Sequence, residues 1–122
     1  MKLENLGIDD KVIAVTPLDK IMGTHGFIRG ENWDYERVTY DYKISSQEKN
    51  VTFYVRIQGE AIEGDVDSRT AVIKLKTPLL GKHYYPHGIE YGEEENFPKD
   101  TVERAIQQVK RANADLEEFL AE

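Results

Sequence analysis

Residues 34–58, DYERVTYDYKISSQEKNVTFYVRIQ, carry the clearest structural pattern in this chain. Apolar and polar side chains alternate along residues 34–44 and again along residues 51–58, whereas residues 45–50 are polar. Alternation with a period of two is typical of a half-buried strand, and two such runs around a short polar connection predict a β-hairpin. We therefore expect strands near 34–44 and 51–59, each with one face on the core.

The pattern continues toward the C-terminus with a third strand and a long helix. Residues 70–77 alternate again, and Pro78 ends that strand or places it at an edge, because proline cannot donate a hydrogen bond to the ladder. Apolar residues from Val102 to Leu120 recur at intervals of three and four, which predicts a helix over about 100–120. Asp100 and Glu103 have the spacing of a capping box at its start.

A shorter helix is expected on the N-terminal side of the hairpin. It would run from Pro17 to about His25, with Thr16 as its cap and Gly26 as the left-handed residue that ends it. The elements together predict one α+β domain over residues 1–122, in two layers. Its antiparallel sheet of three to five strands would be packed on one face by the long C-terminal and the short N-terminal helix. The predicted core is Val38, Tyr40, Tyr42, Ile44, Val51, Phe53, Val55, Ile57, Ile73, Leu75, Val102, Ile106, Val109 and Leu116.

Composition restricts the class of protein. The chain has 122 residues, 16 Lys and Arg against 23 Asp and Glu, a net charge of −7 and no Cys. Disulfides and thiolate metal sites are excluded, and the acidic balance argues against a nucleic-acid partner. The chain has no apolar stretch of membrane-spanning length and no signal-peptide pattern at residues 1–11. We expect a cytoplasmic protein without a membrane association or a cofactor.

The most unusual segment is HYYPHGIEYG at residues 83–92, which contains two of the three His residues. His83, His87, Glu90 and Tyr91 are the candidate ligand or metal-binding residues, since imidazole and carboxylate groups bind transition metals and His titrates near neutrality. A metal would need a further ligand, for which His25 is available. The alternative is a rigid turn shaped by Pro86 and Gly88, with no metal, and we favour this alternative.

A second candidate lies on the predicted polar face of the hairpin. Tyr35, Arg37, Tyr54 and Arg56 would be neighbours on that face if the two strands pair. Tyrosine and arginine are enriched in the energetically dominant parts of protein interfaces. The same residues would also suit an ordinary solvated sheet face. We interpret them as a candidate interface, with a homodimer as the expected partner arrangement.

Three segments also support a resemblance: WDYERVTYD at 33–41, YVRIQGEAIEGDV at 54–66 and LLGKHYYPHGIEYGEEENFP at 79–98. Together they resemble the YugN-like family of small bacterial proteins. The resemblance implies an α+β fold and brings no assigned activity and no catalytic residues. Because the two helices can cover only one side of the sheet, the expected function is a non-enzymatic binding or interaction module that self-associates through its sheet. The alternative is a small enzyme or metal-binding protein that uses residues 83–91.

Overall fold

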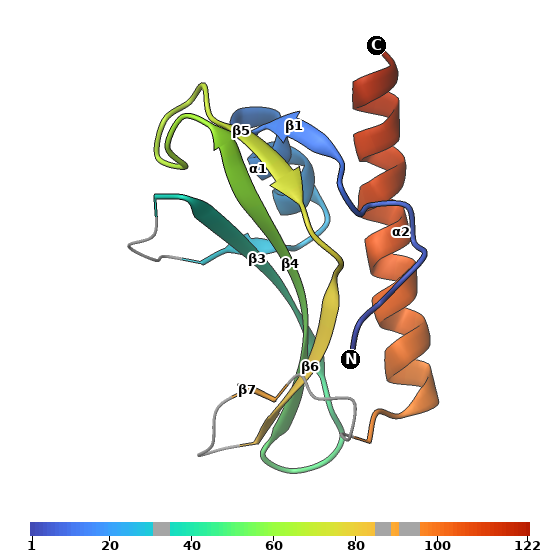
Figure 1. The fold of residues 1–122 in the computed structure, drawn as a ribbon. Helices are drawn as coiled ribbons and strands as arrows, with labels where there is room; N and C mark the ends of the chain where they lie inside the picture. Colours follow the sequence, from blue (N-terminus) through green and yellow to red (C-terminus); the bar gives the residue numbers. More distant parts are fainter. Residues whose placement is uncertain (31–34, 85–88, 91–95) are drawn as a thin grey trace.

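The computed structural model describes residues 1–30, 35–84, 89–90 and 96–122, without the side chains of 89–90. The elements, in chain order, are β1 (Val12–Ala14), α1 (Val15–Thr24), β2 (Ile28–Arg29), β3 (Arg37–Ser45), β4 (Val51–Glu63), β5 (Val72–Leu75), β6 (Leu79–Tyr84), β7 (Ile89–Glu90) and α2 (Lys99–Ala121) (Figure 1). The α+β class, the hairpin and both helices are confirmed.

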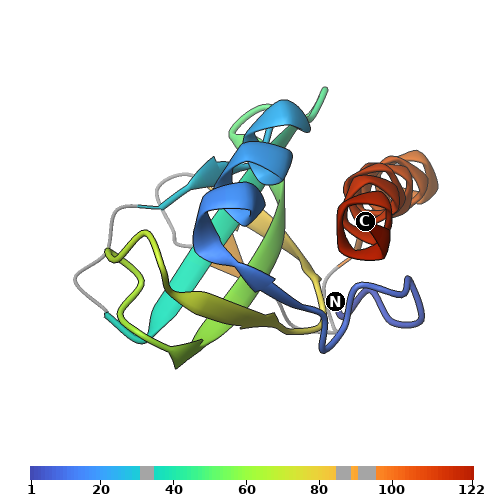
Figure 2. The same ribbon diagram turned by 90° about the horizontal axis from the view of Figure 1, so that it is seen from above.

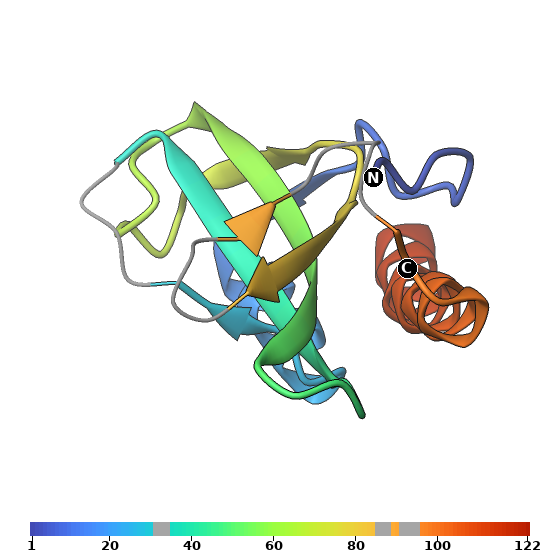
Figure 3. The same ribbon diagram turned by 90° about the horizontal axis from the view of Figure 1, so that it is seen from below.

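Within the described residues the strands form one antiparallel, seven-stranded sheet. Its main order is β1-β5-β4-β3-β2, and β6 pairs with both β4 and β7. Both β5 and β6 can pair with β4 because this strand is long: β6 pairs with residues 51–56 and β5 with residues 59–63 along the same edge. β6 and β7 consequently lie at the end of the sheet away from α1 (Figures 1 and 3).

The sheet has more strands than the three to five that the sequence predicts. β2 and β7 have only two residues each, too few to show any alternation. β6 begins directly after Pro78 and extends into His83 and Tyr84, which the sequence favoured as part of a turn. Pairing with β4 supplies the hydrogen bonds that hold this aromatic segment extended.

Both helices pack on the same face of the sheet. Val38, Tyr40 and Ile44 of β3 are buried on that face, and so are the odd-numbered residues of β4 from Val51 to Ile57. α1 buries Val15, Leu18 and Met22. α2 runs along one side of the molecule, with the N-terminal segment beside it (Figures 1 and 2). The predicted core is confirmed, except that Tyr42, Val102 and Ile106 are only partly buried against it.

The predicted helix caps are wrong. α1 begins after Ala14, and the Thr16 hydroxyl donates instead to the carbonyl oxygen of Arg69, 3.1 Å away. α2 begins after Pro98, so that Asp100 lies inside the first turn, where its carboxylate accepts from the Thr101 amide. Each helix therefore begins before its predicted start: α1 at Val15 rather than Pro17, and α2 at Lys99 rather than about Asp100. Gly26 has the expected left-handed conformation, with φ of +79°.

None of the helices within the described residues combines the length and the apolar composition needed to cross a membrane.

Candidate functional site

The face of the sheet opposite the helices, here called the uncovered face, carries most of the candidate interface. The register of β3 and β4 places Arg37 opposite Glu60, Thr39 opposite Gln58, Asp41 opposite Arg56 and Lys43 opposite Tyr54. Opposite residues of an antiparallel pair point to the same side. The side chains near the middle of β4 are half-buried rather than fully exposed. The uncovered face is thus a defined surface with partly shielded polar groups.

Arg56 is fixed at the centre of this face. Its Nε and Nη2 atoms each donate to one carboxylate oxygen of Asp41, both at 2.9 Å. This bidentate geometry is the strongest arrangement of an arginine and a carboxylate. The carboxylate partner of this arginine thus comes from the neighbouring strand of the same sheet. Asp41 is a residue of the site that sequence reasoning did not single out, although its place in the alternation was the available signal.

The structure separates the four candidate interface residues into two groups. Tyr54 and Arg56 lie next to each other along β4, and the Tyr54 ring meets the His83 ring edge-on with centroids 6.4 Å apart. Arg37 lies four residues further along the face, opposite Glu60. Tyr35 is exposed and precedes β3. The expected single cluster of tyrosine and arginine is therefore an extended row.

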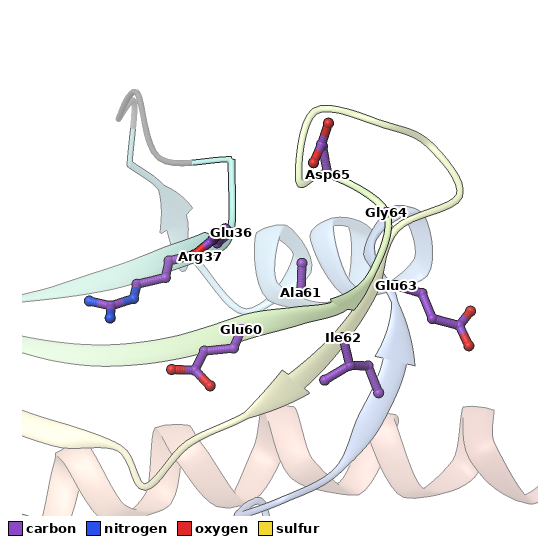
Figure 4. A pocket seen from close by; sticks show the side chains of 8 residues that line it. All are labelled: Glu36, Arg37, Glu60, Ala61, Ile62, Glu63, Gly64 and Asp65. Atoms are coloured by element: carbon purple, nitrogen blue, oxygen red, sulfur yellow. The ribbon is translucent and has the colours of Figure 1, made fainter.

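A shallow hollow of about 470 Å³ lies at the Arg37 end of the row (Figure 4). It is lined mainly by charged side chains: Glu36, Arg37, Glu60, Glu63 and Asp65, together with Ala61, Ile62 and Gly64. Figure 4 shows Glu60 and Ile62 projecting to the same side of β4, with Ala61 on the other. Ligand pockets are predominantly apolar with a few polar groups, so this composition does not favour a buried small molecule.

Glu60 is the group of this hollow whose titration is perturbed. Its carboxylate lies 2.6 Å from Nζ of Lys76, and this hydrogen bond and charge hold the pKa of Glu60 below its usual range. Arg37 and Lys74 add smaller effects in the same direction. Glu60 is therefore ionised at neutral pH and already has a cationic partner within the chain.

The other predicted site lies largely outside the described residues. These exclude His87, Tyr91 and the side chain of Glu90. His83 is half-buried in β6, where it faces Thr52 of β4. His25, the further ligand considered, lies 2.6 Å from Asp115 of α2. The described residues contain no cluster of three metal-ligating side chains, and the metal-site hypothesis stays a prediction.

The fold and this face define a class: a small α+β protein whose antiparallel sheet has one helix-covered face and one uncovered polar–aromatic face. A sequence profile of the YugN-like family matches residues 4–120. The chain belongs to that family.

Similar proteins are known from Bacillus subtilis and Geobacillus kaustophilus. The Bacillus subtilis (strain 168) protein YlbA is 53% identical over 105 residues, which is 86% of each chain. YugN of the same organism is 22% identical over 110 residues, covering 90% of this chain and 80% of YugN. The crystal structure of YugN from Geobacillus kaustophilus HTA426 superposes with a TM-score of 0.87 at 47% identity, over 100% of this chain and 99% of the other. All three are described as uncharacterized, so they support the fold and bring no activity.

Proposed function

We propose that this protein is a non-enzymatic interaction module of the cytoplasm that self-associates through the uncovered face of its sheet. The observation that supports the proposal is the order of the side chains on that face. Both helices pack on the opposite side of the sheet, yet the central side chains of β4 are half-buried, and Arg56 is held by two hydrogen bonds to Asp41. An interface of ordered side chains has less conformational entropy to lose when a partner binds.

The charges of the face suit contact with a second copy. Arg56 is neutralised by Asp41, and Lys76 by Glu60 at 2.6 Å. A two-fold dimer brings the same surface patch of both copies together, so unpaired like charges would oppose it. Ion pairs formed within each copy reduce that repulsion. They would still have to be desolvated, and a partner that contributes further hydrogen bonds offsets this cost.

The size of the face limits the interface. Only β3 and β4 are long, with 9 and 13 residues, and the other strands have 2 to 6. At about 16 Å² of sheet face per strand residue, the face measures roughly 600 Å². Each partner of a standard interface contributes about 800 Å², so side chains at the margins have to contribute as well. Exposed apolar side chains lie toward the margins of the sheet, on β1 (Val12), β2 (Ile28) and β4 (Ile62).

A matched pair of variants tests the proposal. Gln58→Arg places a charge in the centre of the uncovered face, where Gln58 is half-buried opposite Thr39. Gln107→Arg makes the same change on an exposed position of α2. Sedimentation equilibrium at micromolar concentrations should find a dimer, weakened at least about tenfold by Gln58→Arg and unchanged by Gln107→Arg, where tenfold corresponds to about 1.4 kcal/mol.

Two results would contradict self-association through the sheet. One is a wild-type protein that sediments as a 14.1 kDa monomer at every concentration tested. The other is a dimer that both variants weaken equally, which would place the contact elsewhere on the surface. Circular dichroism of each variant shows whether the fold is retained.

A further inference from the structure

A groove between the two helices has a composition different from that of the uncovered face. It lies between α1 and the C-terminal part of α2, which occupy the same end of the molecule (Figure 1). Pro17 and Ile21 of α1 and Phe119 of α2 form its apolar surface. Phe119 is 41% exposed. An aromatic side chain exposed to this extent beside other apolar groups is a typical anchor point for a partner.

The rim of the groove is acidic. It is lined by Asp115 and Glu118 of α2 and by Glu122 directly after it, against Lys20 of α1, which gives a net charge of −2 from three carboxylates and one ammonium group. Among the described residues, Glu118 and Glu122 form no ion pair. The last turn of α2 contains no basic residue, so the negative end of the helix dipole adds to the carboxylates. The groove therefore attracts a cation next to an apolar group.

The dimensions indicate what kind of cationic group fits. The groove has a volume of about 290 Å³. Cavities that bury a small-molecule ligand usually hold about 300 to 1,000 Å³, so this one is at the lower limit. It suits the side chains of a protein segment better than a metabolite. The hollows at Arg37 and at Tyr42 are larger, at about 470 and 530 Å³, but charged and polar side chains dominate their walls.

The walls of the groove are fixed before any partner binds. Nε2 of His25, directly after α1, lies 2.6 Å from Oδ2 of Asp115 on α2. The side-chain amide of Gln108 donates to the carbonyl oxygen of His25, which adds a second link between the helices. A preformed groove avoids the ordering cost that weakens many interactions.

We propose that this groove docks a basic, amphipathic segment of a partner protein, with an apolar side chain against Phe119 and a Lys or Arg against Glu118 and Glu122. The partner segment is expected to be basic because the rim of the groove is acidic. It is expected to be amphipathic because the floor of the groove is apolar, which a simple acidic patch would lack. This site is separate from the uncovered face, so the partner could bind a monomer or a dimer.

A defined peptide provides the test. The probe is a fluorescent helical peptide of Leu, Ala and Lys, with Leu at i, i+3 and i+4 on one face and Lys on the other; a twin carries Glu in place of Lys. The probe should bind the full chain, and the NMR amide shifts should change mainly in α1 and in residues 115–122. Phe119→Ser and Glu118→Lys should each weaken binding at least about tenfold.

Matched controls separate docking from general attraction to an acidic protein. Leu120→Ser alters the neighbouring side chain, which is equally exposed at 42% but does not line the groove. Glu48→Lys makes the same charge change in an exposed turn. Both should change the affinity less than about twofold. Equal effects of controls and groove variants, or equal binding of the Glu twin, would overturn the proposal.

A dimer that Phe119→Ser converts to a monomer would also overturn it, because the occupant would then be a second copy of the chain. Self-association through the sheet is tested separately by the effect of Gln58→Arg on the dimer. One proposal can therefore be wrong while the other holds.

Discussion

Replacing Tyr40 by Phe removes one hydroxyl from a partly buried hydrogen-bond network that joins four segments of the chain. Tyr40 is 1% exposed, and its hydroxyl donates to Oδ1 of Asp19 in α1 at 2.5 Å. Oδ2 of Asp19 accepts from Nη1 of Arg29 in β2 at 2.9 Å, and Nη2 of Arg29 donates to the carbonyl oxygen of Val66 at 2.8 Å. Asp19 thus holds α1 against β2 and β3.

The expected cost follows from the charge of the acceptor. A hydrogen bond to a charged group contributes about 1.5 to 3 kcal/mol to stability, more than one between neutral groups. The aromatic ring remains in Phe, so packing is preserved. For a domain of this size, 1 kcal/mol changes the melting temperature by roughly 4 °C, and Tyr40→Phe should therefore melt about 6 to 12 °C lower.

Thermal unfolding followed by circular dichroism measures this change. Tyr54→Phe is the matched control, because Tyr54 lies on the uncovered face and its hydroxyl has no hydrogen-bond partner among the described residues. It should melt within about 2 °C of the wild type, as surface substitutions usually do. If Tyr40→Phe also melts within this range, Arg29 alone satisfies Asp19, and the argument that the hydroxyl stabilises the fold is wrong.

The pH dependence of the same pair of proteins gives a second check. Burial, and then the hydrogen bond to Asp19, raise the pKa of Tyr40 above its usual value. The folded protein thus holds this proton more tightly than the unfolded chain, whose tyrosines titrate near pH 10. The stabilisation is fully present below about pH 10 and is lost as the pH rises toward the folded-state pKa. The stability difference between wild type and Tyr40→Phe should therefore shrink above about pH 10, and a constant difference would contradict it.

Three further substitutions have predictable effects. Gly59→Ala should lower the stability by about 1 to 3 kcal/mol, because an added Cβ would lie 2.3 Å from Cγ2 of Ile73; urea denaturation without such a loss would show that the sheet adjusts at no cost. Gly23→Ala in α1 should instead raise the stability by about 0.5 to 1 kcal/mol, since no atom beyond its chain neighbours and the surrounding helix backbone lies within 4 Å of the new methyl group. Lys76→Met should move the pKa of Glu60 upward toward its ordinary range in a carboxyl NMR titration, and an unmoved pKa would mean that Lys76 is not the main cause.

The alternation of side chains was sufficient to predict the central hairpin and its buried face. A strand that packs on one side only must place every second residue on the core, so Val38, Tyr40 and Ile44 could be assigned before the structure was known. The same argument holds for α2, whose 23 residues repeat the helical period often enough to be recognised. These are local properties, and they need no knowledge of what the segment packs against.

The pairing of distant segments could not be obtained in this way. β6 extends through His83 and Tyr84 because residues 51–56 of β4 offer it a free edge, a fact absent from its own sequence. Arg56 has Asp41 as its partner only through the register of the hairpin, and the groove at Phe119 exists only because α1 and α2 meet. Contacts between residues far apart in the chain depend on the position of whole elements. Short local patterns carry no information about that position, so only the tertiary structure brought these candidate surfaces together.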